Sequence, residues 1–111
     1  MSMTIDSVLD EQLELMRQGD SAALAARYSE DGQMIHSGGV ANGRAEIEAE
    51  FASQAALHPA VESLSEAGRG EDCVNYRGVM AVSGERIGVA GTFVLRDGEI
   101  WRHTTIITSV E

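Results

Sequence analysis

The sequence contains no lysine, so all eight of its basic residues are arginines. Schiff-base catalysis, which requires a lysine amine, is therefore excluded. Eighteen acidic residues outweigh the arginines and give a formal net charge of −10. This charge argues against a nucleic-acid partner, because such a partner requires a basic surface. The single cysteine, Cys73, excludes an intrachain disulfide and a Cys-x-x-Cys metal site.

Long hydrophobic runs are also missing, because glycine or a charged residue interrupts each apolar run after a few positions. This pattern excludes a membrane-spanning helix, and we expect no membrane partner. The first 15 residues carry acidic groups in place of the basic and apolar regions of a signal peptide, so we expect a cytoplasmic protein. With 43% hydrophobic residues among 111, the composition predicts one globular domain over residues 1–111.

Apolar residues recur at helical spacing in the first half of the sequence. The predicted helices span residues 4–18, 21–28 and 42–57, and the only proline ends the third. The Gly19-Asp20 pair separates the first two. Gln12 lies on the apolar stripe of the first helix with Val8, Leu9 and Met16. If Gln12 is buried, its amide needs a hydrogen-bond partner or a cavity. The alternative is that Gln12 sits at the edge of the stripe.

The remaining sequence predicts strands, which span residues 33–37, 61–67, 73–82, 86–96 and 100–109. Ser83-Gly84 is a tight-turn signal, and Asp97-Gly98 is the strongest hairpin signal in the chain. Three helices followed by an antiparallel meander predict an α+β fold. Strand 86–96 is apolar on both faces, and the helices cover only one, so we expect a second copy of the chain to cover the other.

The succession of segments resembles the nuclear transport factor 2 (NTF2)-like superfamily, which includes SnoaL-type polyketide cyclases and ketosteroid isomerases. The resemblance rests on helix–Gly-Asp–helix, then YSEDGQMIH, then NGRAEIEAEF and the RDGEIWR hairpin, and it covers nearly the whole chain. It implies a cone-shaped fold in which three N-terminal helices are wrapped by a curved antiparallel sheet around a pocket. It also implies a homodimer formed through the outer face of the sheet.

Three positions correspond to the catalytic residues of ketosteroid isomerases, and none of the family's residues is retained there. The position of the carboxylate base is His36, that of the protonated aspartate is Thr92, and that of the catalytic tyrosine is Gln12. The resemblance therefore does not predict steroid isomerisation by the usual apparatus. All three positions are nevertheless polar, which suits a working pocket. The alternative is that His36 is a structural histidine at the end of a strand.

Further residues are expected near the pocket. Trp101 and His103 are two residues apart on the last strand, so they are expected to face the same side, either at the pocket mouth or at the dimer interface. Together with Tyr28 they are the predicted substrate-binding residues. The two histidines at 36 and 103 lack metal-ligand spacing, so no metal is expected. Arg44 is expected to have a structural role.

These observations predict a cofactor-independent enzyme of the isomerase, cyclase or lyase type acting on a hydrophobic small molecule. His36 would be the general base, and Gln12 or Thr92 would hold the substrate oxygen. The alternative is a non-catalytic ligand-binding or dimerisation domain of the same fold. In the expected dimer, Phe93 and Val89, with Trp101 or His103, would lie near the two-fold axis.

Overall fold

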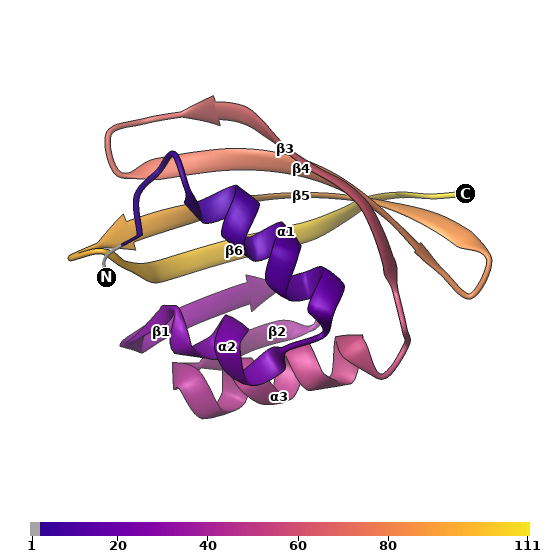
Figure 1. The fold of residues 1–111 in the computed structure, drawn as a ribbon, viewed down its shortest axis with the longest axis horizontal. Helices are drawn as coiled ribbons and strands as arrows, with labels where there is room; N and C mark the ends of the chain where they lie inside the picture. The colour runs from indigo at the N-terminus through magenta and orange to yellow at the C-terminus, as the bar shows by residue number, and fades with distance from the viewer. Residues whose placement is uncertain (1–2) are drawn as a thin grey trace.

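A computed structural model describes residues 3–111 as helices packed on the concave side of a curved sheet (Figure 1). The helices are α1 (Val8–Gln18), α2 (Ser21–Ala26) and α3 (Gly43–Ala55). The strands are β1 (Tyr28–His36), β2 (Gly39–Asn42), β3 (Ala60–Arg69), β4 (Cys73–Val82), β5 (Glu85–Arg96) and β6 (Glu99–Val110). The predicted α+β class is confirmed.

The sheet has six strands in the order β2-β1-β6-β5-β4-β3. The four strands β3 to β6 form the predicted antiparallel meander. In addition, β1 pairs parallel with β6 and antiparallel with β2, so the sheet is mixed. The sequence did not predict β2. It extended the second helix to Tyr28 and began the next strand only at residue 33, so it missed the first half of β1. That helix is short because the chain enters the sheet directly after Arg27, whose carbonyl accepts the Ile100 N–H at 3.0 Å.

Local signals fix the ends of the helices and hairpins. Gly19 adopts a left-handed conformation (φ 67°) that ends α1, and the Asp20 carboxylate caps α2 by accepting the Ala23 N–H at 3.0 Å. The Ser83-Gly84 and Asp97-Gly98 pairs both have positive φ at each position, as tight hairpin turns of the mirror-image type require. Both predicted hairpins are therefore confirmed.

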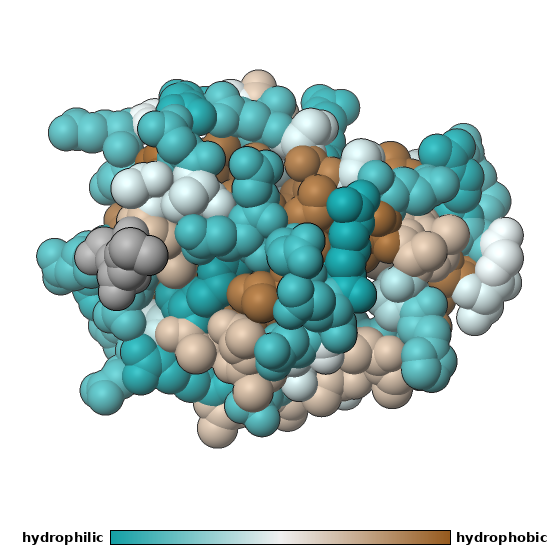
Figure 2. All heavy atoms as spheres, in the orientation of Figure 1, coloured by the Kyte–Doolittle hydropathy of each residue, from teal (hydrophilic) through white to brown (hydrophobic). Residues whose placement is uncertain are grey.

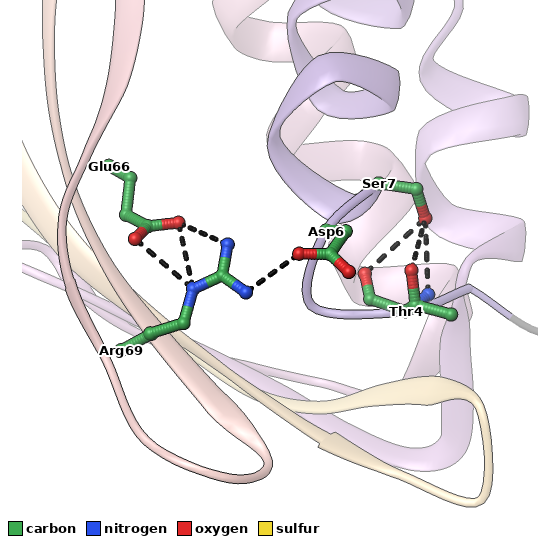
Figure 3. A network of polar contacts seen from close by, with 5 residues as sticks. All are labelled: Thr4, Asp6, Ser7, Glu66 and Arg69. Atoms are coloured by element: carbon green, nitrogen blue, oxygen red, sulfur yellow. Dashed lines mark hydrogen bonds and ion pairs between the residues drawn. The ribbon is translucent and has the colours of Figure 1, made fainter.

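The first helix begins later than predicted, because the residues before it form a turn. The Ser7 hydroxyl accepts the Thr4 N–H at 3.1 Å (Figure 3). Arg69, at the end of β3, holds this turn by donating to Asp6 at 2.7 Å and to Glu66 at 2.6 Å (Figure 3). The turn is thus anchored to the far edge of the sheet.

The core lies between the helices and the concave face of the sheet. Its fully buried side chains are Tyr28, Phe93, Met34, Ile47, Ile100, Val8 and Val74. Arg44 joins the helical layer to the sheet, because its guanidinium donates to the Tyr28 carbonyl at 2.7 Å and to Glu99 at 2.9 Å. These contacts confirm its predicted structural role.

Figure 2 shows hydrophobic side chains exposed beside α1, framed by hydrophilic residues. Among residues 3–111, no helix is long and apolar enough to cross a membrane. The large hydrophobic residues that remain exposed within residues 3–111 are Ile35, Val40, Leu57, Ile106, Ile107 and Val110. Three of them, Leu57, Ile106 and Ile107, also line the cavity described next.

Candidate functional site

A cavity of about 270 Å³ lies between the helices and the concave face of the sheet. This is close to the lower bound of roughly 300 Å³ for typical ligand pockets. Most of its wall is apolar, with Met16, Met34, Phe51, Leu64, Val89 and Phe93 among the lining residues. The polar lining residues are Gln12, His36, Ser37, Glu50, Gln54, Tyr76, His103 and Thr105. The cavity is therefore suited to a small, mostly apolar molecule.

The cavity has a buried end and an open end. Tyr76, His103 and Gln12 are exposed by only 5%, 4% and 2%, so they mark the deep end. Leu57 and Ile106 are exposed by 60% and 56%, so they mark the mouth. Polar groups lie at both ends, and the apolar wall separates them.

Two tyrosines and a histidine form a buried chain at the deep end. The Tyr28 hydroxyl lies 2.7 Å from His103 Nδ1, and the Tyr76 hydroxyl lies 2.7 Å from His103 Nε2. The His103 ring is stacked on Phe93, with ring centroids 4.1 Å apart. The three residues come from β1, β4 and β6, so their arrangement depends on the completed sheet.

Burial determines the protonation of this chain. Burial, with a smaller contribution from the positive charge of Arg27, lowers the pKa of His103 to about 3, so the ring is neutral at pH 7. Burial also raises the pKa of Tyr76 to about 12 and that of Tyr28 well above its ordinary value. Both tyrosines therefore keep their hydroxyl protons.

The hydrogen bonds of Tyr28 indicate which tautomer His103 adopts. Tyr28 is fully buried, and within residues 3–111 its hydroxyl has Nδ1 of His103 as its hydrogen-bond partner. The Tyr28 proton must therefore point to Nδ1, because a buried unpaired donor is costly. The ring proton then lies on Nε2 and is donated to the Tyr76 oxygen. This leaves the Tyr76 proton available to a ligand in the cavity.

Gly91 makes room for Tyr76 to reach His103. Gly91 lies on β5, the strand between the strands of Tyr76 and His103. It pairs with Tyr76 on β4 and with Thr105 on β6. A Cβ atom at Gly91 would lie 2.7 Å from the Tyr76 hydroxyl oxygen and would also clash with the carbonyl of Thr104. Any side chain at this position would thus displace the tyrosine from its histidine partner.

A histidine and a carboxylate meet nearer the mouth. His36 Nε2, at the end of β1, lies 3.8 Å from Glu50 Oε2 on α3. The opposite ring nitrogen, Nδ1, accepts the Gly38 N–H at 3.2 Å. With this lone pair occupied, neutral His36 carries its proton on Nε2 and directs it towards Glu50. Both residues line the cavity, and the Glu50 carboxylate is then the proton acceptor of the pair.

The register of β1 and β6 sets the spacing of the two ends. Met34 pairs with His103, and His36 follows Met34 by two residues on the same strand. A two-residue step along one strand and one step to the next place the Cα atoms of His36 and His103 roughly 8 Å apart. A small molecule can therefore contact both polar groups at once.

Gln12 belongs to the deep end. Its amide oxygen accepts a hydrogen bond from Nη1 of Arg27, which orients the amide. Gln12 is buried and lines the cavity, so the predicted buried amide has both a partner and a cavity. The structure thus brings Gln12, His36 and His103 to one cavity.

The other predicted site residues lie outside the cavity lining. The Thr92 hydroxyl donates to Asn75 at 2.7 Å, and its neighbour Phe93 faces the cavity instead. Tyr28 is behind His103 and contacts the cavity through it. Trp101 lies between the guanidinium groups of Arg96 and Arg102, at 4.6 and 4.0 Å from its ring centroid.

A β-bulge accounts for the position of Trp101. Leu95 pairs with Ile100, whereas the preceding residue Val94 pairs with Arg102, so Trp101 is the extra residue of β6. The bulge shifts the alternation, and Ile100 and His103 face the core three residues apart. The expectation that Trp101 and His103 share a face was therefore wrong.

Sequence reasoning missed Tyr76 and Glu50. Tyr76 alternates with Val74 and Gly78 on the buried face of β4, a signal that was present in the sequence but indicates only burial. Glu50 directly precedes the buried Phe51 on α3. A position at the edge of a buried helical stripe does not indicate that Glu50 has a histidine partner on another element.

The chain shows no grouping of three or more His, Cys, Asp or Glu side chains suited to a metal ion within residues 3–111. No family model matches the sequence, and no curated protein is significantly similar to it. Solved structures do match it.

A protein from Sphaerobacter thermophilus is 22% identical, with a TM-score of 0.85 over 97% of this chain and 99% of its own. An NTF2-like protein of unknown function from Cytophaga hutchinsonii is 16% identical, with a TM-score of 0.73 over 97% and 93%. A protein with a ketosteroid isomerase-like fold from Catenulispora acidiphila, in complex with trimethylamine, is 18% identical, with a TM-score of 0.73 over 92% and 85%. These similarities confirm the NTF2-like fold that the sequence resemblance predicted.

Proposed function

We propose that the chain is a small-molecule enzyme of the isomerase, cyclase or lyase type that works by proton transfer without a cofactor. One observation carries the proposal: a carboxylate–histidine pair and a neutral hydrogen-bond donor line the same apolar cavity. Removal of a proton from carbon needs a base at one end of the substrate and a donor where negative charge develops at the other. The two ends of the cavity supply these groups.

The carboxylate of Glu50 is the proposed base. Its contacts are long, because His36 Nε2 lies at 3.8 Å and Gln54 Nε2 at 3.5 Å, so its oxygens remain free to accept a proton. His36 directs an N–H towards the carboxylate and orients it. His36 thus acts as a positioning residue, whereas the sequence predicted it as the base itself.

Tyr76 is the proposed donor to the substrate oxygen. Its own oxygen accepts from His103, and the resulting polarisation strengthens the hydrogen bond that its proton makes in the cavity. The amide of Gln12 lines the same end and is a second candidate donor. Removing one donor of this kind typically lowers the rate on the order of 10²–10³-fold.

The cavity indicates a class of substrate. A volume of about 270 Å³ and apolar walls suit a compact molecule with one carbonyl or hydroxyl oxygen. No arginine lines the cavity among the described residues, which disfavours substrates that carry a carboxylate or phosphate. The Catenulispora acidiphila protein of the same fold was crystallised with trimethylamine, which supports small-molecule binding within this fold.

A chromogenic carbon acid tests the proposal without knowledge of the natural substrate. In 5-nitrobenzisoxazole, a base removes the proton from C3, the N–O bond breaks, and the oxygen leaves as a coloured phenolate. We expect the protein to accelerate this reaction and Glu50→Gln to lower the rate by about 10²-fold or more. Tyr76→Phe should lower it less. Glu48→Gln, a change of an exposed carboxylate on the same helix, should leave it unaffected.

Two results would contradict the proposed roles. Full activity of Glu50→Gln together with loss of activity in His36→Gln would return the base to His36. Saturable binding of the probe without any acceleration would favour the alternative function, a non-catalytic ligand-binding domain.

A further inference from the structure

The charges that line the cavity are unbalanced. Within residues 3–111, Glu50 is the only acidic side chain of the lining, and no arginine joins it there. His103 and Tyr76 are neutral at pH 7, which leaves the ring of His36 as the other titratable group. The cavity therefore presents one carboxylate and no permanent positive charge.

The carboxylate of Glu50 has weak partners. Within the described residues its only ion pair is with His36, whose Nε2 lies 3.8 Å from Oε2, and Gln54 Nε2 lies 3.5 Å from Oε1. Both distances exceed those of a normal hydrogen bond. The Glu50 side chain is only 31% exposed, so water solvates it incompletely. A carboxylate in this position gains from a cation placed beside it.

The cavity walls contain groups that attract organic cations. These are the aromatic rings of Phe51, Tyr76 and Phe93 and the polarisable thioethers of Met16, Met34 and Met80. An aromatic ring attracts a cation through its negative face, most strongly where water is excluded. A metal ion would instead need several oxygen or nitrogen ligands, and residues 3–111 contain no group of three or more His, Cys, Asp or Glu side chains that could supply them.

The charge of the whole chain favours the approach of a cation. The formal net charge is −10. On α3, Glu46 and Glu48 add to the charge of Glu50, and the one arginine of this helix, Arg44, is paired with Glu99 at 2.9 Å. A field of one sign concentrates ligands of the opposite sign around a site. Cations are therefore drawn to the molecule, whereas anions are repelled.

We propose that the cavity binds a compact hydrophobic ammonium ion, with Glu50 as its counter-ion and the apolar wall around its alkyl or aryl groups. The inference rests on the proposed function only in taking the same cavity as the binding site, because it requires the charge of Glu50 and not the transfer of a proton. A cavity of about 270 Å³ limits the ligand to the size of a single substituted ring. Such an ion would cover the proposed base, so it would compete with a carbon acid.

Isothermal titration calorimetry with phenyltrimethylammonium and tert-butylbenzene tests the inference. The two probes have the same shape, and only the first carries a charge. We expect Glu50→Gln to weaken binding of the cation by about tenfold or more and to leave the affinity for tert-butylbenzene unchanged. Glu48→Gln, an exposed position on the same helix, is the matched control and should change neither affinity. His36→Gln keeps the carboxylate and should still bind the cation.

Three results would overturn the inference: a wild-type protein that does not bind phenyltrimethylammonium, an unchanged affinity for it in Glu50→Gln, or an equal loss of both probes in that variant. Calorimetry detects binding without turnover, so the two proposals can fail separately. Turnover of 5-nitrobenzisoxazole without cation binding would overturn the inference alone. Cation binding that depends on Glu50 supports it, even where no carbon acid is turned over.

Discussion

At the scale of residues, the tyrosines offer a direct test of the deep end of the cavity. The chain has two tyrosines, and both are buried with raised pKa values: burial raises the pKa of Tyr76 to about 12 and that of Tyr28 well above its ordinary value. In the unfolded chain both ionise near pH 10. Their contribution to stability is therefore complete below pH 10 and is lost as the pH rises through 12.

We expect an alkaline titration followed at 295 nm to show no tyrosinate near pH 10. The absorbance should rise only at higher pH, together with the loss of secondary structure seen by circular dichroism. A step of half the full amplitude near pH 10, with the circular dichroism unchanged, would show that one tyrosine is exposed and would contradict the buried chain.

Residue patterns predicted part of the site. Gln12 and His36 stood out as polar groups in apolar surroundings, and both line the cavity. Thr92, the third predicted polar residue, does not line the cavity, because the alternation of β5 turns Phe93 inward and Thr92 outward. Glu50 was missed because its meaning depends on a partner from another element, and a single sequence gives no contacts.

At the scale of elements, local signals predicted the helices and hairpins better than they predicted the pairing of strands that are distant in the sequence. Helical spacing and turn dipeptides located α1, α3 and the meander, because these depend on neighbouring residues. The pairing of β1 with β6 joins residues about 70 positions apart in the chain, such as Met34 and His103. No local pattern specifies such a contact, so the mixed sheet and the short β2 were not predicted.

The bulge at Trp101 shows how an element can change a site. Regular alternation predicted that Trp101 would accompany His103, but the extra residue in β6 turned the indole to the outer face of the sheet. The bulge also faces Ile100 and His103 inward together. The histidine of the deep end is thus positioned by an irregularity that the alternation of apolar residues does not reveal.

At the scale of the whole molecule, we propose that two copies pair through the outer face of the sheet. The sequence placed Phe93 and Val89 at that interface. Phe93 is fully buried and both residues line the cavity, so this part was wrong. The outer face carries Ala90 and Val94 on β5. It is the face that the helices leave uncovered.

Light scattering at low micromolar concentration tests the pairing. We expect a mass near twice the 11.9 kDa of the chain. Ala90→Glu, at the middle of the outer face, should give a monomer with an unchanged circular dichroism spectrum, because two glutamates would meet near the two-fold axis. A wild-type mass near 12 kDa would contradict the dimer, and a dimer that survives Ala90→Glu would place the interface elsewhere.

The central claim is that the cavity binds a small apolar molecule that carries an oxygen, and methionine methyl resonances test it most directly. Met16, Met34 and Met80 line the cavity, whereas Met3 lies against Arg27 outside the lining and serves as the internal control. With ¹³C-methyl methionine, titration of cyclohexanone or 4-nitrophenol should shift the three cavity methyls with one common saturation curve and leave Met3 in place. Methyl resonances that stay unchanged up to the solubility limit, or that shift equally with Met3, would contradict a ligand site in this cavity.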